Sequence, residues 1–175
     1  MLVLITGTSQ GIGKAIAEKF LKENNNVIGI DRCEATISHP RYKHYLCDVR
    51  DFDNLPDIED INVLINNAGT QNEADIDINL KALIHITEKY GVQDKIKSIL
   101  NIGSASGHTG AEFPEYCASK GGVMAYTKNA WAIYNPELPD EEQDDAFITL
   151  AKLENIEAGI ENAHKLAEEA AGTPG

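Results

Sequence analysis

The sequence has few basic residues and no long hydrophobic run. Lysine and arginine number 15 against 28 aspartates and glutamates, a formal net charge of −13. A chain this acidic repels a phosphate backbone or an anionic membrane surface, so we expect no nucleic-acid and no membrane partner. No apolar stretch reaches the about 18 residues of a spanning helix. The first strand-like run starts at Leu2, which leaves no room for a leader peptide and predicts a cytoplasmic protein.

Cysteines and metal-ligand patterns are also scarce. The chain has 3 cysteines and no CxxC pair, which fits free thiols and argues against a disulfide framework. Cys33, His39, His44 and Cys47 are separated by five, four and two residues, spacings that match no common zinc pattern. We therefore expect no bound metal. With 175 residues, 42% hydrophobic and 25% charged, the chain suits one folded domain rather than disorder.

Short apolar runs alternate with helical patterns along most of the chain. Runs at 2–6, 27–30, 45–47, 61–65 and 96–102 are typical of strands buried on both faces. Apolar residues at helical spacing predict helices over 11–24 and 76–90. This alternation predicts an α/β fold, a Rossmann-like doubly wound parallel sheet of about five strands in the order 3-2-1-4-5.

The last part of the chain has a different composition. Residues 130–175 contain 11 acidic and two basic residues, and apolar positions from Leu150 to Ala170 recur at helical steps. We therefore expect a Rossmann-like domain with the motifs over 1–135. An acidic helical segment over 136–175 would pack on this domain or extend it. The apolar stripe of that segment, together with Trp131, would suit a contact within the chain or between subunits, which leaves a homo-oligomer open.

A glycine-rich turn, TGTSQGIG at 6–13, lies between the first predicted strand and helix. Glycines there allow backbone amides to approach a diphosphate closely, and the helix N-terminus adds partial positive charge. A mononucleotide P-loop fits poorly, because five residues separate Gly7 from Gly13 and Ala15 replaces the magnesium-binding hydroxyl. Taken alone, an ordinary strand-to-helix turn is the alternative.

Asp31 ends the second predicted strand, about twenty residues after the glycines. A carboxylate at this place accepts hydrogen bonds from the adenosine ribose hydroxyls and repels a 2′-phosphate. Arg32 softens that repulsion, but no basic residue stands at the position of Gln10, so the sequence favours NAD over NADP. A solvated aspartate at a strand end is the alternative for Asp31 on its own.

The motifs and their order resemble the short-chain dehydrogenase/reductase family over residues 2 to about 129. The matching motifs are the glycine turn, Asp31, Asp48-Val49, Asn66-Asn67-Ala68-Gly69, Asn79, Ser104 and Tyr116-x-x-x-Lys120. The resemblance implies that Asp48 and Val49 border the adenine and that 67–69 close the floor of the cofactor site. The cofactor-binding residues expected from all of this are Gly7, Ser9, Gln10, Gly11, Ile12, Gly13, Asp31, Asp48, Val49, Asn67, Ala68, Gly69, Tyr116 and Lys120.

The residues also predict a catalytic group. Tyr116 and Lys120 are four residues apart, hence on one face of a helix. A tyrosine has an unperturbed pKa of about 10 and needs a nearby cation, here Lys120, to supply phenolate at neutral pH. Ser104 follows a predicted strand and can hydrogen-bond a substrate oxygen. By resemblance, Asn79 holds a water that relays the proton through the lysine. The expected catalytic residues are Asn79, Ser104, Tyr116 and Lys120.

These motifs predict an oxidoreductase that transfers a hydride between NAD and a small secondary alcohol or ketone. Tyr116 would act as general base in oxidation and as acid in reduction. A surface tyrosine beside a solvated lysine, or a nucleophilic pair of Cys117 and His108, are weaker alternatives. After Asn135 the sequence shows no pattern typical of the family's sixth strand or of the loop that covers the substrate. The second hypothesis is therefore a truncated, chimeric or engineered nucleotide-binding scaffold without turnover.

Overall fold

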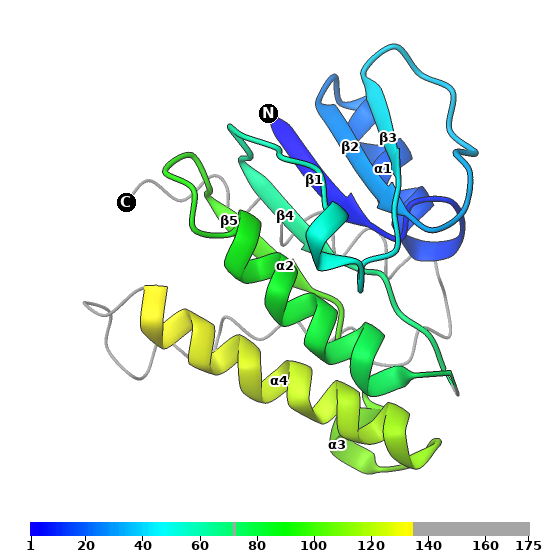
Figure 1. Cartoon of the computed structure of the whole chain (residues 1–175), viewed down its shortest axis with the longest axis vertical. Helices are drawn as coiled ribbons and strands as arrows, with labels where there is room; N and C mark the ends of the chain where they lie inside the picture. Colours follow the sequence, from blue (N-terminus) through cyan, green and yellow to red (C-terminus); the bar gives the residue numbers. More distant parts are fainter. Residues whose placement is uncertain (72, 135–175) are drawn as a thin grey trace.

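The computed structural model of the chain describes residues 1–71 and 73–134. Within these ranges, five parallel strands form one sheet in the order β3-β2-β1-β4-β5 (Figure 1). The strands are β1 (Leu2–Thr6), β2 (Asn26–Asp31), β3 (Tyr42–Leu46), β4 (Val63–Asn66) and β5 (Ser98–Asn101). The chain therefore has the predicted doubly wound fold, and the strand order reverses between β1 and β4. Open parallel sheets bind ligands beyond the carboxyl ends of the strands at such a reversal.

Helices cover both faces of the sheet, with α2 and α4 in front of it in Figure 1 and α1 behind it. The helical elements are α1 (Gly11–Lys22), η1 (Phe52–Asn54), η2 (Ile76–Ala82), α2 (Leu83–Tyr90), α3 (Ser106–Thr109) and α4 (Pro114–Tyr134). Among the residues that the structure describes, no helix is long and apolar enough to cross a membrane.

Two hydrophobic clusters, one on each face, hold the layers together. Alternate residues of a strand point to opposite faces, so Val3 packs with Phe20 of α1, while Leu4 packs with Ile86 of α2. This two-sided burial explains why the central strands β1 and β4 are continuous apolar runs. Full burial of a side chain such as Phe20 contributes about 2 kcal/mol.

Several element boundaries differ from the prediction. The third strand was expected at 45–47 but begins at Tyr42, because it pairs along β2 from Val27↔Tyr42 to Asp31↔Leu46. It is an edge strand with half-exposed polar residues, so its start cannot be recognised from a run of apolar residues. The strands expected at 61–65 and 96–102 form over Val63–Asn66 and Ser98–Asn101.

The helix expected over 76–90 is two elements rather than one. It opens as the π-helical η2 and continues as α2, and hydrophobic periodicity over so few residues does not distinguish the two. Single π-helical turns inside α-helices occur frequently at functional sites. The helix expected over 11–24 ends at Lys22, and Asn24 has a positive φ of 64°. The acidic helical segment expected over 136–175 lies outside the described residues.

Buried amide side chains connect the last two strands with α4. Asn66 at the end of β4 donates to Asn101 Oδ1 of β5 at 2.8 Å, and Asn101 donates to the Thr127 hydroxyl of α4 at 3.0 Å. Asn66 also donates to Thr87 of α2 at 2.9 Å. These bonds fix the direction of α4 relative to the carboxyl ends of the strands.

Candidate active site

The glycine turn after β1 is shaped by close contacts between backbone groups. Gly7 has a φ of +77° and donates its N–H to Ile30 O at 2.8 Å. A Cβ at Gly13, in the first turn of α1, would lie 2.1 Å from Gly7 O. Any larger residue at position 13 would therefore push α1 away from β1. The Asn67 side chain reinforces this junction by donating to Thr6 O and Gly7 O, both at 3.0 Å.

The N-terminus of α1 has the character of an anion site. Its N-cap residue Gln10 makes no capping hydrogen bond through its side chain, and the first turn contains no acidic residue. The first N–H groups of an α-helix have no partner within the helix and carry partial positive charge. Such a terminus next to a glycine turn suits a phosphate group.

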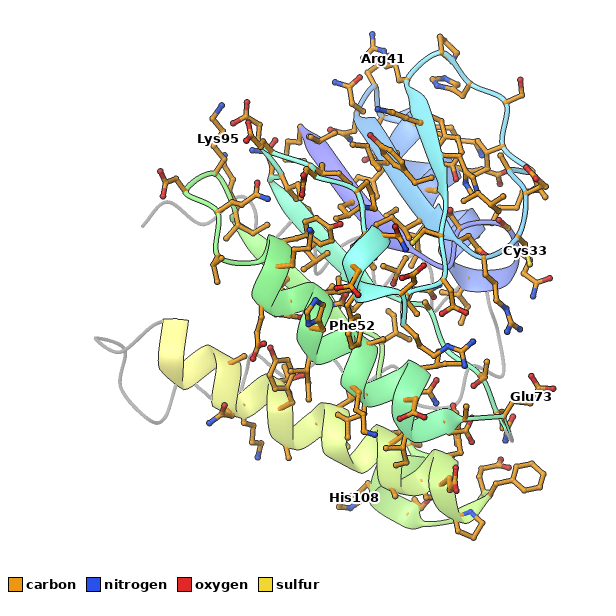
Figure 2. All side chains as sticks on the ribbon, viewed as in Figure 1. Cys33, Arg41, Phe52, Glu73, Lys95 and His108 are labelled. Atoms are coloured by element: carbon orange, nitrogen blue, oxygen red, sulfur yellow. The ribbon has the colours of Figure 1, made fainter. Side chains whose placement is uncertain are left out.

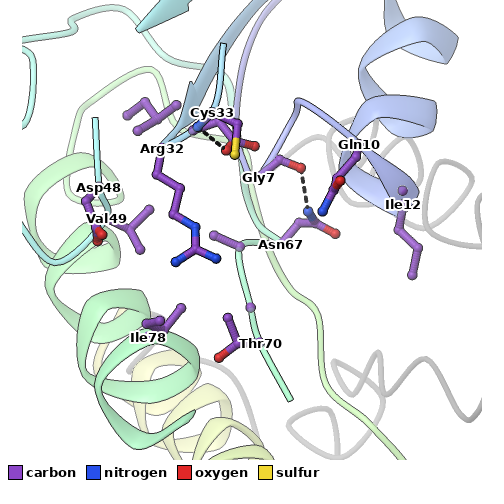
Figure 3. Close-up of a pocket in the computed structure, with 15 residues that line it drawn as sticks. Gly7, Gln10, Ile12, Arg32, Cys33, Asp48, Val49, Asn67, Thr70 and Ile78 are labelled. Atoms are coloured by element: carbon purple, nitrogen blue, oxygen red, sulfur yellow. Dashed lines mark hydrogen bonds between the residues drawn. The ribbon is translucent and has the colours of Figure 1, made fainter. Parts of the chain in front are cut away.

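A cavity of about 420 Å³ lies in front of this terminus (Figure 3). Asp31 is held at its edge, because its carboxylate accepts hydrogen bonds from Ser9 N and Cys33 N, each at 2.9 Å. Figure 3 shows the Arg32 side chain pointing into the cavity. The lining residues are Gly7, Gln10, Gly11, Ile12, Ile30, Asp31, Arg32, Cys33, Asp48, Val49, Asn67, Ala68, Gly69, Thr70 and Ile78.

Of the expected cofactor-binding residues, Tyr116 and Lys120 line the second cavity described below, whereas Ser9 and Gly13 line neither. Ser9 is buried and donates its hydroxyl to Cys33 O at 3.0 Å, so it ties the glycine turn to the segment after β2. Gly13 provides the close packing described above. Five lining residues were not among the expected cofactor-binding residues, namely Ile30, Arg32, Cys33, Thr70 and Ile78. All of them except Cys33 lie directly beside a residue of a recognised motif.

Asp48 contributes a fixed negative charge to the cavity wall. Arg50 donates to its carboxylate through Nε at 3.0 Å and Nη2 at 2.6 Å. These hydrogen bonds are the main reason that the pKa of Asp48 is lowered to about 2. Next to it, the buried side chain of Val49 and that of Ile78 add apolar surface to the cavity.

A second cavity, of about 470 Å³, continues from the first. Four residues line both cavities, namely Ile12, Asn67, Gly69 and Thr70. Three of the expected catalytic residues, Ser104, Tyr116 and Lys120, line the second cavity. At its edge, Gln71 donates to the carboxylate of Glu112 at 3.0 Å. The two ends of the predicted site thus belong to one continuous groove.

Tyr116 and Lys120 lie together near the start of α4. The Lys120 ammonium is 5.9 Å from the centroid of the Tyr116 ring and donates to Ile102 O at 2.8 Å. Lys120 is only 6% exposed, and this burial lowers its pKa to about 8, while the negative charge of Asp75 opposes the fall. The Ser104 hydroxyl oxygen accepts the N–H of Ser106 at 3.2 Å, which leaves its proton available to a ligand in the cavity.

Asn79, the fourth expected catalytic residue, lines neither cavity. Its amide side chain accepts Thr70 N at 2.8 Å and donates to Thr70 O at 2.9 Å. It also donates to the Ser119 hydroxyl at 3.1 Å, and Ser119 donates to Tyr116 O at 2.8 Å. Asn79 therefore joins η2, the loop after β4 and the helix with the tyrosine.

The alternative nucleophilic pair does not assemble in this structure. His108 belongs to α3, is exposed and lies at the outer edge of the molecule (Figure 2). The Cys117 sulfur accepts the N–H of Glu112 at 3.4 Å, a contact typical of a packed thiol. Among residues 1–71 and 73–134, no group of three or more His, Cys, Asp or Glu side chains is placed to hold a metal ion.

Comparison with known proteins identifies the family. The family model for short chain dehydrogenase matches residues 1–137, so the chain belongs to that family. It is 32% identical over 161 residues to 15-hydroxyprostaglandin dehydrogenase [NAD(+)] of Rattus norvegicus, covering 74% of this chain and 60% of the relative. The chain thus spans about 60% of the length of that relative.

Solved structures agree with this assignment. Ligand-free aldohexose dehydrogenase from Thermoplasma acidophilum superposes with a TM-score of 0.66 at 29% identity, covering 77% of this chain and 62% of that protein. A 4-hydroxyisoleucine dehydrogenase complexed with NADH also gives 0.66, at 25% identity, with coverages of 78% and 70%.

Proposed function

We propose that this chain is an NAD-dependent oxidoreductase that interconverts a small secondary alcohol and its ketone. One observation carries the proposal: the glycine turn with Asp31, and the group of Ser104, Tyr116 and Lys120, line adjoining cavities that share four residues. A dinucleotide bound at the first cavity would reach the second. Family membership and relatives named for dehydrogenase activity support the same reading.

The residues present fit a nicotinamide dinucleotide. The close approach of Gly13 to Gly7 and the N-terminus of α1 suit its diphosphate. Asp31 would bind the adenosine ribose, with Asp48 and Val49 beside the adenine. Tyr116 and Lys120 would hold the nicotinamide ribose. When bound, the dinucleotide supplies the hydride donor or acceptor of the reaction. A relative named for NAD(+) and a similar structure containing NADH support this cofactor class.

The preference for NAD over NADP depends on two neighbouring side chains of opposite charge. The Asp31 carboxylate is immobilised by Ser9 N and Cys33 N, so it stays at the ribose position and repels a 2′-phosphate. Arg32 points into the same cavity and attracts one. We infer that Asp31 prevails, because two backbone hydrogen bonds hold it at the ribose position while Arg32 is exposed to solvent.

Each proposed catalytic residue has a defined role in moving a proton or in contacting the substrate. In oxidation, Tyr116 accepts the proton of the substrate hydroxyl, and in reduction it returns that proton to the carbonyl oxygen. The Lys120 ammonium beside the ring stabilises the phenolate. The Ser104 hydroxyl donates to the substrate oxygen. Hydrogen bonds of Asn79 with Thr70 and with Ser119 of α4 hold these segments in place around the three residues.

The nucleotide-binding scaffold without turnover is the second candidate function. The observation that favours it is that the family model matches residues 1–137, while residues 130–175 have the acidic composition described above. A cytoplasmic location and a homo-oligomer remain predictions from the sequence.

The experiment that tests the proposal is a titration of the purified chain with NADH and with NADPH. Energy transfer from Trp131, the only tryptophan, reports binding, and calorimetry checks the affinity. We expect saturable binding with NADH preferred, followed by turnover in a panel of small alcohols and ketones. Binding of NADH without turnover across that panel would favour the scaffold. Absence of binding to either dinucleotide would overturn both functions.

A further inference from the structure

Two charged side chains are buried in the described part of the molecule, and they have opposite signs. Asp75 is 0% exposed and Lys120 is 6% exposed, while every other charged residue described is at least partly exposed. An isolated charge removed from water is costly, so a buried charge requires a compensating partner. The surroundings of these two buried charges therefore need an explanation.

Asp75 is the N-cap residue of η2 and is held by the loop that borders the catalytic cavity. Its Oδ1 accepts Glu73 N at 3.3 Å and lies 3.0 Å from the Thr70 hydroxyl. Thr70 lines both cavities. Asp75 itself lines neither cavity.

The same hydrogen-bonded chain connects Asp75 with the catalytic helix. Asp75 contacts Thr70, the backbone of Thr70 binds the Asn79 amide, and Asn79 binds Ser119, the residue before Lys120. Lys120 donates to Ile102 O, a neutral acceptor that does not balance its charge. Burial lowers the pKa of Lys120, and the negative charge of Asp75 raises it. Two other titratable groups line the cavity with Lys120, namely Tyr116 from α4 and Glu112 at the edge.

We propose that Asp75 is a positioning residue whose buried negative charge keeps Lys120 in its ammonium form beside Tyr116. The proposal deepens the proposed function and rests on it for its catalytic meaning. Asp75 acts through Lys120, because it contacts neither cavity. Without this charge, a buried lysine gives up its proton at a lower pH and stops stabilising the phenolate.

The direct test follows the charge state of Lys120 without requiring turnover. The chain is labelled with 13C-lysine, the Cε resonance of Lys120 is assigned from its loss in Lys120→Met, and its shift is followed against pH by NMR. We expect the midpoint in Asp75→Asn to fall by about half a pH unit or more. The amide oxygen of asparagine still accepts the Thr70 and Glu73 hydrogen bonds.

Asp77→Asn is the matched control. Asp77 belongs to the same helix, loses the same charge, and is exposed beside Lys81 rather than buried. Its substitution should leave the Lys120 midpoint unchanged. An equal shift in both variants would overturn the proposal, because the diffuse field of a chain with a net charge of −13 would then be the cause. The absence of a shift in Asp75→Asn would overturn it as well.

Measurements on the native chain keep the proposal testable if Asp75→Asn does not fold. The Lys120 Cε shift should be that of an ammonium at pH 7, and 1 M NaCl should leave the midpoint unmoved because a buried pair is poorly screened. A neutral Lys120 at pH 7 contradicts the proposal, as does a midpoint that falls in salt.

The enzymatic readout separates this proposal from the proposed function. If the chain turns over, Asp75→Asn should lower kcat for alcohol oxidation at pH 7 while the KM for NAD stays within about twofold, because the cofactor cavity is untouched. The alkaline limb of the kcat profile should move to lower pH. If the native chain binds NADH without turnover, the proposed function fails, and the NMR titration still decides the role of Asp75.

Discussion

The two ends of the groove are built in different ways. At the glycine end, adjoining backbone segments at 6–13 and 67–69 provide the contacts, and the decisive feature is the absence of side-chain atoms at Gly13. At the proposed catalytic end, the lining groups come from separate elements: Thr70 after β4, Ser104 after β5, and Tyr116 with Lys120 on α4, with Asn79 of η2 hydrogen-bonded to Thr70 behind them. The first end depends on steric fit and the second on packing and charge. Substitutions should therefore affect binding and stability at the first end, and turnover at the second.

The largest effect should come from Tyr116→Phe. Removing the hydroxyl that exchanges the proton should lower kcat by about a thousandfold, while the affinity for NADH stays within about twofold. Steady-state kinetics and the NADH titration measure the two quantities. Tyr126→Phe is the matched control, since Tyr126 is on the same helix and lines neither cavity. Equal activity of Tyr116→Phe and the native chain would refute the mechanism.

Gly13→Ala should disturb the other end of the groove. The added methyl group would lie 2.1 Å from Gly7 O and 2.3 Å from Asn67 Nδ2, so α1 must shift. We expect a loss of about 3 kcal/mol in the free energy of unfolding from this overpacking, measured by denaturant titration. The affinity for NADH should fall about a hundredfold, which corresponds to about 2.7 kcal/mol.

Gly11→Ala is the comparison for the stability measurement. At this position no atom of the described residues lies within 4 Å of an added Cβ, but the φ of +59° is strained for alanine. Its cost should be about 1 kcal/mol. If Gly13→Ala costs no more than Gly11→Ala, close packing is not what requires glycine at position 13.

Removing either charge at the ribose position should have an intermediate effect on cofactor affinity. Asp31→Ala removes an acceptor of ribose hydrogen bonds and the repulsion of a 2′-phosphate, so NADH affinity should fall about tenfold and NADPH affinity should hold or rise. Arg32→Ala should shift the preference in the opposite direction, toward NADH. Parallel fluorescence titrations measure all four affinities. An unchanged ratio of NADH to NADPH affinity in Asp31→Ala would remove Asp31 from the site.

The smallest effect concerns the pH dependence of stability through Asp48. The folded pKa of about 2 lies below the ordinary value of about 3.9. The ionised carboxylate therefore stabilises the fold above about pH 4, and this contribution disappears as the pH falls toward 2. Asp48→Asn should cost up to about 1 kcal/mol at pH 7. Urea unfolding at pH 7, 4 and 2.5 measures the difference between the chains, and a difference that does not change with pH would show that Arg50 does not stabilise the charge.

Sequence reasoning succeeded where the constraint was local. The apolar runs of β1 and β4 and the glycine turn are contiguous, so their burial and turn geometry can be inferred from the letters alone. The edge strand β3 was misplaced because Lys43 and His44 interrupt its apolar pattern. Asp75 was missed for a different reason. An aspartate among EADID resembles an exposed acidic run, and only the packing of η2 buries it.

The two hydrogen bonds between the Asn79 amide and the backbone of Thr70 close the intervening residues into a loop with a fixed base. The length of that loop is then independent of the geometry at its base. Substitutions of Gln71 would change the wall of the second cavity without moving Thr70 or α4. This makes the loop a natural place for exchanging substrate selectivity between proteins by grafting, while the proton-transfer groups stay in place.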